Sequence, residues 1–344
     1  MKTIIKTLLV SIASLSLMFS VNAGELTVNG TAKATYNATS GNQADNGIGI
    51  TNELNLKASG EMDNGFTWSY SMEMDTASGA SNMNNDDTQI TIGMNDMGTL
   101  KICVSECGNN KKYAWDASAY TSMSDTGTSY GITYPGDAGA ANTGTIQYHT
   151  PELPFGTTAS VAYNTNMGHD SASGNETGVS GNSREEYSLV TKPIDGLTLS
   201  AHYNKVNDYD DGTTTEQQLE EGGSYAAKYS AGNFTFGYGK SFQAPELTTA
   251  VAGGTTDAEY YENTGVSVAF AVNDDLSVSF TREESEVNYA HSATAGNDIE
   301  MDSIQVAYSL GGATLSLARA DYENVSYVAN EDATETIVAM TFAF

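Results

Sequence analysis

Bulky apolar residues alternate with small or polar residues along most of the chain. This period of two residues is typical of a β-strand that has one apolar face and one polar face. The end of the chain shows the pattern most clearly, where one face is formed by Thr336, Val338, Met340, Phe342 and Phe344. The same alternation begins at Phe66, at Phe234 and at Leu276. We therefore expect an all-β fold.

The connections between the strands that this pattern predicts alternate in length. Short connections such as Asp63-Asn64-Gly65 and Gly311-Gly312 contain residues that adopt positive φ in hairpins. Long connections are polar or acidic, and the third of them, residues 107–142, is the longest. The sixteen predicted strands are 24–38, 47–61, 65–76, 86–95, 98–106, 143–150, 157–166, 184–193, 196–206, 222–231, 233–242, 259–272, 275–288, 300–310, 312–323 and 333–344.

This sorting of loop lengths predicts an antiparallel transmembrane β-barrel, with short periplasmic turns and long outer loops. Sixteen strands enclose a lumen that is too wide for side chains to fill. The polar face must then line water, and the apolar face must meet lipid. Because the number of strands is even, both ends of the barrel chain are expected on the periplasmic side.

The N-terminus has the layout of a cleaved signal peptide. Lys2 and Lys6 precede an apolar run from Leu8 to Val21, and Val21-Asn22-Ala23 has the small-x-small pattern that signal peptidase cuts. We expect cleavage after Ala23, so that residues 1–23 are the signal peptide and residues 24–344 form the barrel. A retained N-terminal anchor is the alternative, although the apolar run is short for a membrane span.

Charge and histidine content limit the classes of function. The formal net charge of −29 argues against nucleic acid as a partner, because phosphates are bound by Lys and Arg. The four His residues are dispersed, so we expect no metal site, no other cofactor and no catalytic centre. Acidic clusters in the outer loops, such as Asp208, Asp210 and Asp211, are candidates for loosely bound Ca²⁺ or Mg²⁺, with ordinary solvation as the alternative.

Cys103 and Cys107 are the only cysteines, and an exported chain meets an oxidising compartment. We therefore expect a disulfide bond, with two free thiols as the alternative. Residues four apart are about 13 Å apart in an extended strand, so the chain must turn between them. Cys103 has the same parity as Lys101, which places its side chain on the lumen face where the third outer loop begins.

Several segments carry a family resemblance. They are the start Gly24-Glu25-Leu26-Thr27-Val28-Asn29-Gly30, the segment Gly49-Ile50-Thr51-Asn52-Glu53-Leu54, the hairpin Asn64-Gly65-Phe66-Thr67-Trp68 and the terminal Phe344. With these segments the chain resembles the Gram-negative general (diffusion) porins, and more closely their alphaproteobacterial type.

The resemblance implies a trimeric 16-stranded barrel in the cell outer membrane, with its third outer loop folded inward to narrow the pore. It also implies contact with outer-membrane lipid and lipopolysaccharide. Met340, Phe342 and Phe344 would then be the C-terminal signal that the barrel-insertion machinery recognises. One departure is that loop 107–142 lacks an acidic Pro-Glu-Phe-Gly-Gly-like motif, which leaves the acids of the constriction open.

A diffusion pore needs a water-filled constriction whose width and charges select the solutes. Strand parity predicts lumen-facing bases, and the third loop supplies acids and bases close to each other. Opposed charges across the lumen would create a transverse field, with ordinary solvation of each residue as the alternative. The candidates are Lys33, Lys57 and Lys101 on the wall, and Lys111, Lys112, Asp116, Asp125 and Asp137 in the loop.

These features predict passive passage of ions and small hydrophilic solutes, with a preference for cations. A substrate-specific channel, for instance for sugars, is the first alternative, because aromatic residues of the third loop would form a slide along the pore. They are Tyr113, Trp115, Tyr120 and Tyr130. A closed structural or adhesive barrel is the second alternative.

Overall fold

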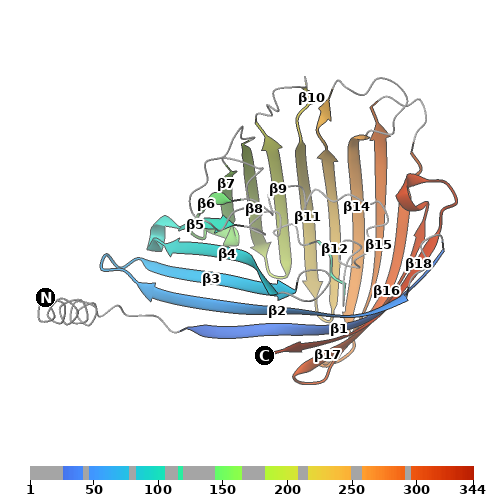
Figure 1. Ribbon diagram of the computed structural model, residues 1–344, viewed down its shortest axis with the longest axis horizontal. Helices are drawn as coiled ribbons and strands as arrows, with labels where there is room; N and C mark the ends of the chain where they lie inside the picture. The colour runs from blue at the N-terminus through green and yellow to red at the C-terminus, as the bar shows by residue number, and fades with distance from the viewer. Residues whose placement is uncertain are drawn as a thin grey trace, which may run out of the picture.

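The computed structural model describes residues 26–41, 46–76, 83–104, 115–118, 144–164, 183–207, 216–248, 258–290 and 296–344. Sixteen antiparallel strands form one closed barrel (Figure 1). Within these ranges, no helix has both the length and the apolar character required to span a membrane. The predicted signal peptide lies outside the described residues, so cleavage after Ala23 stays a prediction.

Each predicted strand corresponds to one strand of the barrel, which confirms the sixteen-stranded architecture. In chain order, the strands are β1 (Thr27–Gly41), β2 (Asn46–Glu61), β3 (Thr67–Thr76), β4 (Met83–Gly93), β5 (Thr99–Val104), β6 (Thr145–His149), β7 (Thr158–Asn164), β8 (Arg184–Ile194), β9 (Leu197–Val206), β11 (Glu221–Ala231), β12 (Phe234–Ala244), β14 (Ala258–Ala271), β15 (Leu276–Tyr289), β16 (Ile299–Ser309), β17 (Ala313–Glu323) and β18 (Ala333–Ala343).

The short connections are tight turns, as the sequence predicted. Gly65 between β2 and β3 has φ +79°, and Gly311 between β16 and β17 has φ +81°. Backbone with these angles is accessible to glycine without a steric penalty. Two other short connections contain single turns of 3₁₀ helix, η1 (Asn95–Met97) and η5 (Pro154–Gly156).

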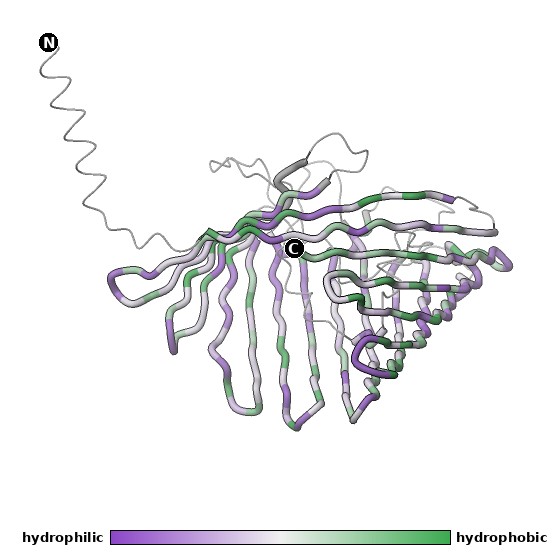
Figure 2. The backbone as a smooth tube through the Cα atoms, turned by 90° about the horizontal axis from the view of Figure 1, so that it is seen from below, coloured by the Kyte–Doolittle hydropathy of each residue, from purple (hydrophilic) through white to green (hydrophobic). Residues whose placement is uncertain are grey.

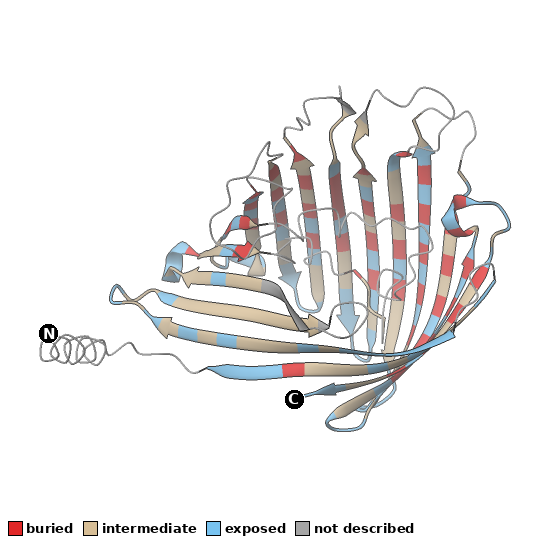
Figure 3. Cartoon of the chain, in the orientation of Figure 1, coloured by how far each residue is buried: buried red, intermediate tan, exposed pale blue. Residues whose placement is uncertain are grey.

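The strands expose one face and cover the other. Burial alternates along much of β9, β12 and β15 to β17 (Figure 3), and hydrophobic and hydrophilic residues follow one another along the strands (Figure 2). On β15, for example, Thr281, Glu283 and Ser285 have no exposed surface, whereas Phe280 is 39% exposed. The covered face is the polar one and points to the lumen. The bare apolar face is therefore the surface that meets lipid, as predicted.

The barrel closes between its first and last strands. Pairing of β1 with β18 runs from Thr31 opposite Ala343 to Gly41 opposite Ala333. Two further backbone hydrogen bonds join Gly30 and Phe344, with N···O distances of 2.8 and 3.0 Å. The terminal residue is thus part of the ladder, which leaves no free edge in lipid.

The structure corrects the sequence analysis at two outer loops that were predicted to lack strands. β10 (Glu216–Gln218) and β13 (Leu247–Thr248) pair with each other in a separate two-stranded sheet. The Gln218 side-chain amide also donates to the carbonyl oxygens of Pro245 and Glu259, at 2.7 and 2.8 Å. Strands of two or three residues are too short to show a period of two, so their sequence carries no signal.

We expect the substitution Gly30→Val to weaken closure of the barrel. A Cβ atom at Gly30 would lie 2.5 Å from the backbone oxygen of Glu53 and 3.0 Å from the ring of Phe344. Overpacking of this kind costs about 1–3 kcal/mol. The urea midpoint of unfolding in detergent micelles, followed by tryptophan fluorescence, should fall. The control is Gly47→Val on β2, where an added Cβ atom would meet no atom within 4 Å. Equal midpoints of unfolding for the two variants would contradict the expectation.

Candidate pore constriction

Residues 115–118 belong to the long connection between β5 and β6, yet they lie on the opposite wall of the lumen. They contact β12, β14 and β15. Around the barrel, six strands separate β5 from β14 in one direction and eight in the other. Residues 115–118 of the third outer loop therefore lie inside the lumen on the far wall, which confirms that the loop folds inward.

Two glycines on the inner wall make room for Trp115, whose side chain is only 4% exposed. A Cβ atom at Gly237 of β12 would lie 1.9 Å from the Trp115 carbonyl oxygen. A Cβ atom at Gly265 of β14 would lie 2.4 Å from carbons of the Trp115 ring. We call this pair of glycines the glycine notch. Glycine in a strand interior often marks such a close approach of another segment, and no larger residue fits here.

Hydrogen bonds fix the loop beside the glycine notch. The backbone N–H of Ala117 donates to Ser267 Oγ at 2.8 Å, and Thr281 Oγ1 donates to Asp116 Oδ1 at 3.3 Å. Ser267 and Thr281 are directly opposite each other on β14 and β15. One cross-strand pair of hydroxyls thus holds two successive residues of the loop.

Asp116 is the one predicted acid of the third loop that lies among the described residues. Besides the bond from Thr281, its carboxylate accepts hydrogen bonds from the backbone N–H and the hydroxyl of Ser118, at 2.9 and 2.5 Å. The Asp116 carboxylate therefore anchors this part of the loop to β15 through hydrogen bonds. Its role as a charge of the constriction stays a prediction.

The predicted wall lysines lie on the side of the barrel that faces the glycine notch. Lys33 on β1 is opposite Thr341, and Lys57 on β2 is opposite Ser71. Lys101 on β5 is opposite Gln147, which is 2% exposed and faces the lumen. These bases and Asp116 lie on opposite walls of the lumen and are not in contact, and the transverse field between them stays a prediction.

The remaining predicted positions fall mostly outside the described residues. This is so for Lys111, Lys112, Asp125, Asp137 and Cys107. Cys103 is described: it faces the lumen, is 6% exposed and is disulfide-bonded. The sequence contains one other cysteine, Cys107.

Buried charges on the lumen wall went unnoticed in the sequence. Arg184 has no exposed surface and forms an ion pair with Glu220 at 2.6 Å. Glu283 has no exposed surface either, and Glu335 is 1% exposed and accepts a hydrogen bond of 2.6 Å from the Asn37 amide. Strand parity was sufficient to place all three charges on the polar face, because each lies three residues from an outward apolar residue of its own strand, Tyr187, Phe280 or Val338.

A family model described as Gram-negative porin matches residues 9–330. The chain belongs to this family. As the family and the closed barrel indicate, this porin is located in the outer membrane. No curated protein sequence matches it.

Solved porins share the fold at low sequence identity. An anion-selective porin from Comamonas acidovorans is 14% identical, with a TM-score of 0.65 over 93% of this chain and 99% of that one. OmpF of Salmonella typhi in complex with daunomycin is 15% identical, with a TM-score of 0.67 over 93% and 98%. OmpT of Vibrio cholerae in its trimer form is 14% identical, with a TM-score of 0.67 over 94% and 100%. At these identities the likeness shows the fold alone.

We expect Gly265→Val to displace Trp115 from the glycine notch, because the added carbons would overlap the ring. In a Trp68→Phe background, Trp115 is the remaining tryptophan. Its emission should be that of a buried ring and should shift to longer wavelength in the Gly265→Val variant. The control is Gly49→Val on β2, where a Cβ atom meets nothing within 4 Å. An unshifted emission maximum in Gly265→Val would show that the notch does not hold the ring.

Proposed function

We propose that this porin is a general diffusion channel that passes ions and small hydrophilic solutes passively, with a preference for cations. The observation that carries the proposal is a third loop fastened across a lumen whose wall is polar. Ser267 and Thr281, which hold the loop, belong to a face of hydroxyl, amide and charged side chains. Such a lining supports a water-filled path in which width and charge select the solutes.

The charges of the lumen support the preference for cations. Described acids on the lumen face are Glu53, Glu73, Asp75, Glu186, Glu283 and Glu335, to which the loop adds Asp116. Described bases on that face are Lys33, Lys57, Lys101, Arg184 and Lys228. The excess of acids agrees in sign with the net charge of −29. The excess of acids on the lumen face and the negative net charge of the protein both raise the local concentration of cations along the pore.

Substrate specificity and catalysis have less support. The Trp115 ring is buried in the glycine notch, so it is not available for an aromatic slide along the pore. Tyr113, Tyr120 and Tyr130 lie outside the described residues. We propose a channel without enzymatic activity and without a resident cofactor, since size and charge selection require neither. Loose binding of Ca²⁺ or Mg²⁺ at the outer loops stays a prediction.

The outside of the barrel has two unlike walls. Among the described outward positions of β18, β1, β2, β3 and β5 there is no charged side chain, and Ile48 and Ile50 are 83% and 68% exposed. On β12 to β17, outward charges lie above a shorter apolar band. They include Lys240, Glu262, Arg282, Glu284, Glu300, Asp302, Arg319 and Asp321.

We infer that the uncharged wall faces other copies of the chain in a homotrimer. An uncharged wall with large and widely exposed apolar side chains, such as Ile48 and Ile50, suits contact with another protein surface. The charged wall would face lipid and lipopolysaccharide. Recognition of Met340, Phe342 and Phe344 by the barrel-insertion machinery is part of the same proposal.

Bilayer recording under a salt gradient tests the channel and its selectivity. We expect ohmic conductance steps in groups of three. The sign of the reversal potential should be that of a cation-selective channel. Lys101→Glu should raise the cation-to-anion permeability ratio on the order of twofold, because it adds an acid to the lumen wall beside the third loop. The control is Lys205→Glu, at an outward-facing lysine near Glu185, at 3.7 Å. Absence of steps, or a current that one sugar blocks, would favour the closed or substrate-specific alternatives.

The substitution Ala34→Trp tests the proposed subunit interface. Ala34 is exposed on the uncharged wall, and Ala201 is exposed on the opposite wall. Trp is tolerated at a lipid surface but clashes within a packed interface. Light scattering after gel filtration should therefore detect monomers for Ala34→Trp and trimers for Ala201→Trp. Trimers for both variants would place the interface elsewhere.

A further inference from the structure

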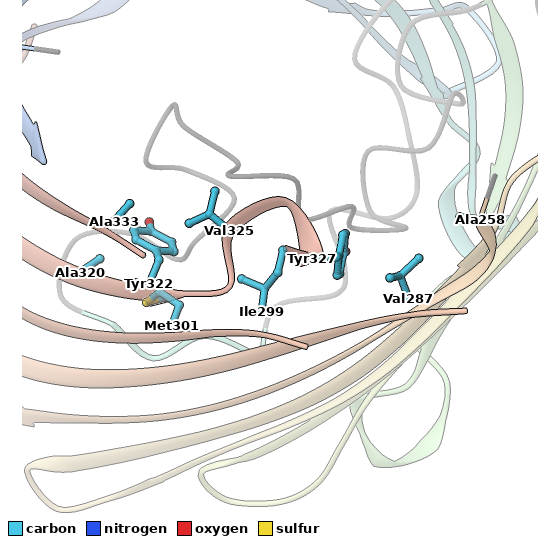
Figure 4. Close-up of a cluster of buried hydrophobic side chains, with 9 residues drawn as sticks. All are labelled: Ala258, Val287, Ile299, Met301, Ala320, Tyr322, Val325, Tyr327 and Ala333. Carbon is cyan, nitrogen blue, oxygen red and sulfur yellow. The ribbon is translucent and has the colours of Figure 1, made fainter. Parts of the chain in front are cut away.

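The last outer loop, residues 324–332, folds back into the mouth of the barrel. It contains the single turn η6 (Val325–Tyr327). Val325 and Tyr327 are 6% and 8% exposed and pack on the inner face of the wall (Figure 4). The cluster that they complete consists of Ala258, Val287, Ile299, Met301, Ala320, Tyr322, Val325, Tyr327 and Ala333. We call residues 324–332 the outer cap.

Tyr327 makes most of the contacts of the outer cap. Its hydroxyl shares a hydrogen bond of 2.8 Å with Ser285 Oγ, and its ring centroid lies 5.7 Å from that of Tyr261. Its backbone oxygen accepts hydrogen bonds from the backbone N–H and the side-chain amide of Asn297, both at 3.3 Å. Because Ser285 belongs to the covered polar face, these contacts hold the cap inside the lumen.

The backbone of the outer cap is internally bonded and strained. The backbone N–H of Val325 donates to the carbonyl oxygen of Glu331 at 2.6 Å. The side-chain amide of Asn324 donates to the carbonyl oxygen of Asp298 at 2.9 Å. Ser326 and Tyr327 have φ of +57° and +62°. Residues with side chains uncommonly adopt such angles, and these angles persist where surrounding contacts enforce them.

The outer cap and the third loop lie at different depths on the same wall. On β15, the cap bonds to Ser285, and the third loop bonds to Thr281. Four residues of a strand correspond to about 13 Å, with Ser285 on the side of the outer end. A solute that enters from outside therefore passes the cap before it reaches the third loop.

We propose that the outer cap is a second constriction of the pore, which limits the size of solutes before they reach the third loop. The inference rests on the proposed role as a diffusion channel. The side chains that hold the cap inward, Val325 and Tyr327, are uncharged and buried. We therefore assign selection by size to the cap, whose two acids, Glu331 and Asp332, are not among the side chains that pack on the wall.

Replacing residues 324–331 with Asn-Gly removes the cap and keeps the barrel. Tyr322 is opposite Ala333, so Glu323 and Asp332 are the next opposed positions, and two residues suffice for a hairpin between them. We expect the single-channel conductance to rise about 1.5-fold and uncharged oligosaccharides excluded by the wild type to enter proteoliposomes. Because the replacement also removes Glu331, its reversal potential in a salt gradient is compared with that of a Glu331→Gln variant, and the two should agree.

Point variants test the same idea with less change to the chain. Tyr327→Ala removes the ring and the hydroxyl that hold the cap, and it should shift conductance and oligosaccharide entry toward those of the hairpin variant. The matched control is Val328→Ala in the same loop, because Val328 is 49% exposed and lies outside the cluster. It should behave as the wild type. Migration of unheated samples in detergent gels verifies that each barrel is folded.

The outcomes separate the two proposals. A wild-type protein that does not conduct would overturn the diffusion channel itself. A conducting wild type with a hairpin variant of equal conductance and equal size limit would overturn only the second constriction. If Tyr327→Ala does not fold, the hairpin variant alone decides, since it lacks the cap altogether.

Discussion

Inside a membrane, every backbone N–H and C=O group must find its partner within the protein, because hydrocarbon offers none. The ladder of sixteen strands meets this demand by closing on itself, from β1 to β18, and the terminal Phe344 is bonded to Gly30 in that ladder. Closure determines the rest of the architecture. It gives each strand one face toward lipid and one toward the lumen, and it requires the first strand to pair with the last. With so many strands, it also leaves a lumen that side chains alone cannot fill.

That wide lumen is occupied by two segments of the chain itself. The third loop lies against the glycine notch, where Gly237 and Gly265 leave space for Trp115, and the hydroxyls of Ser267 and Thr281 hold the residues that follow. The outer cap lies further out on the same wall, where an apolar cluster replaces the polar lining. The inner face of β14 and β15 is therefore a scaffold for both segments. The opposite wall, with Lys33, Lys57 and Lys101, has the bases that face them.

The outside of the barrel is divided as well. The uncharged wall around β1 and β2 exposes large apolar residues such as Ile48, whereas β14 to β17 carry charges such as Arg282 and Asp302 above their apolar band. A single barrel in lipid alone would have a band of equal height on every side. The difference between the walls is explained if one wall is covered by protein and the other by lipid headgroups. The same ladder thus offers its inner face to the proposed pore and its outer face to the proposed trimer.

Strand number, strand faces and loop sorting were all predictable from the sequence, because a period of two and turn residues are local signals. Parity alone placed Lys101 and Cys103 on the lumen side, and the same rule would have found Arg184, Glu283 and Glu335. The tertiary structure was needed to place the described parts of the long loops. Gly265 is an ordinary small residue until Trp115 packs against it, and residues 324–332 look like any polar loop until Val325 and Tyr327 meet the inner wall. Contacts between segments that are distant along the chain depend on the shape of the closed barrel, and no local pattern records that shape.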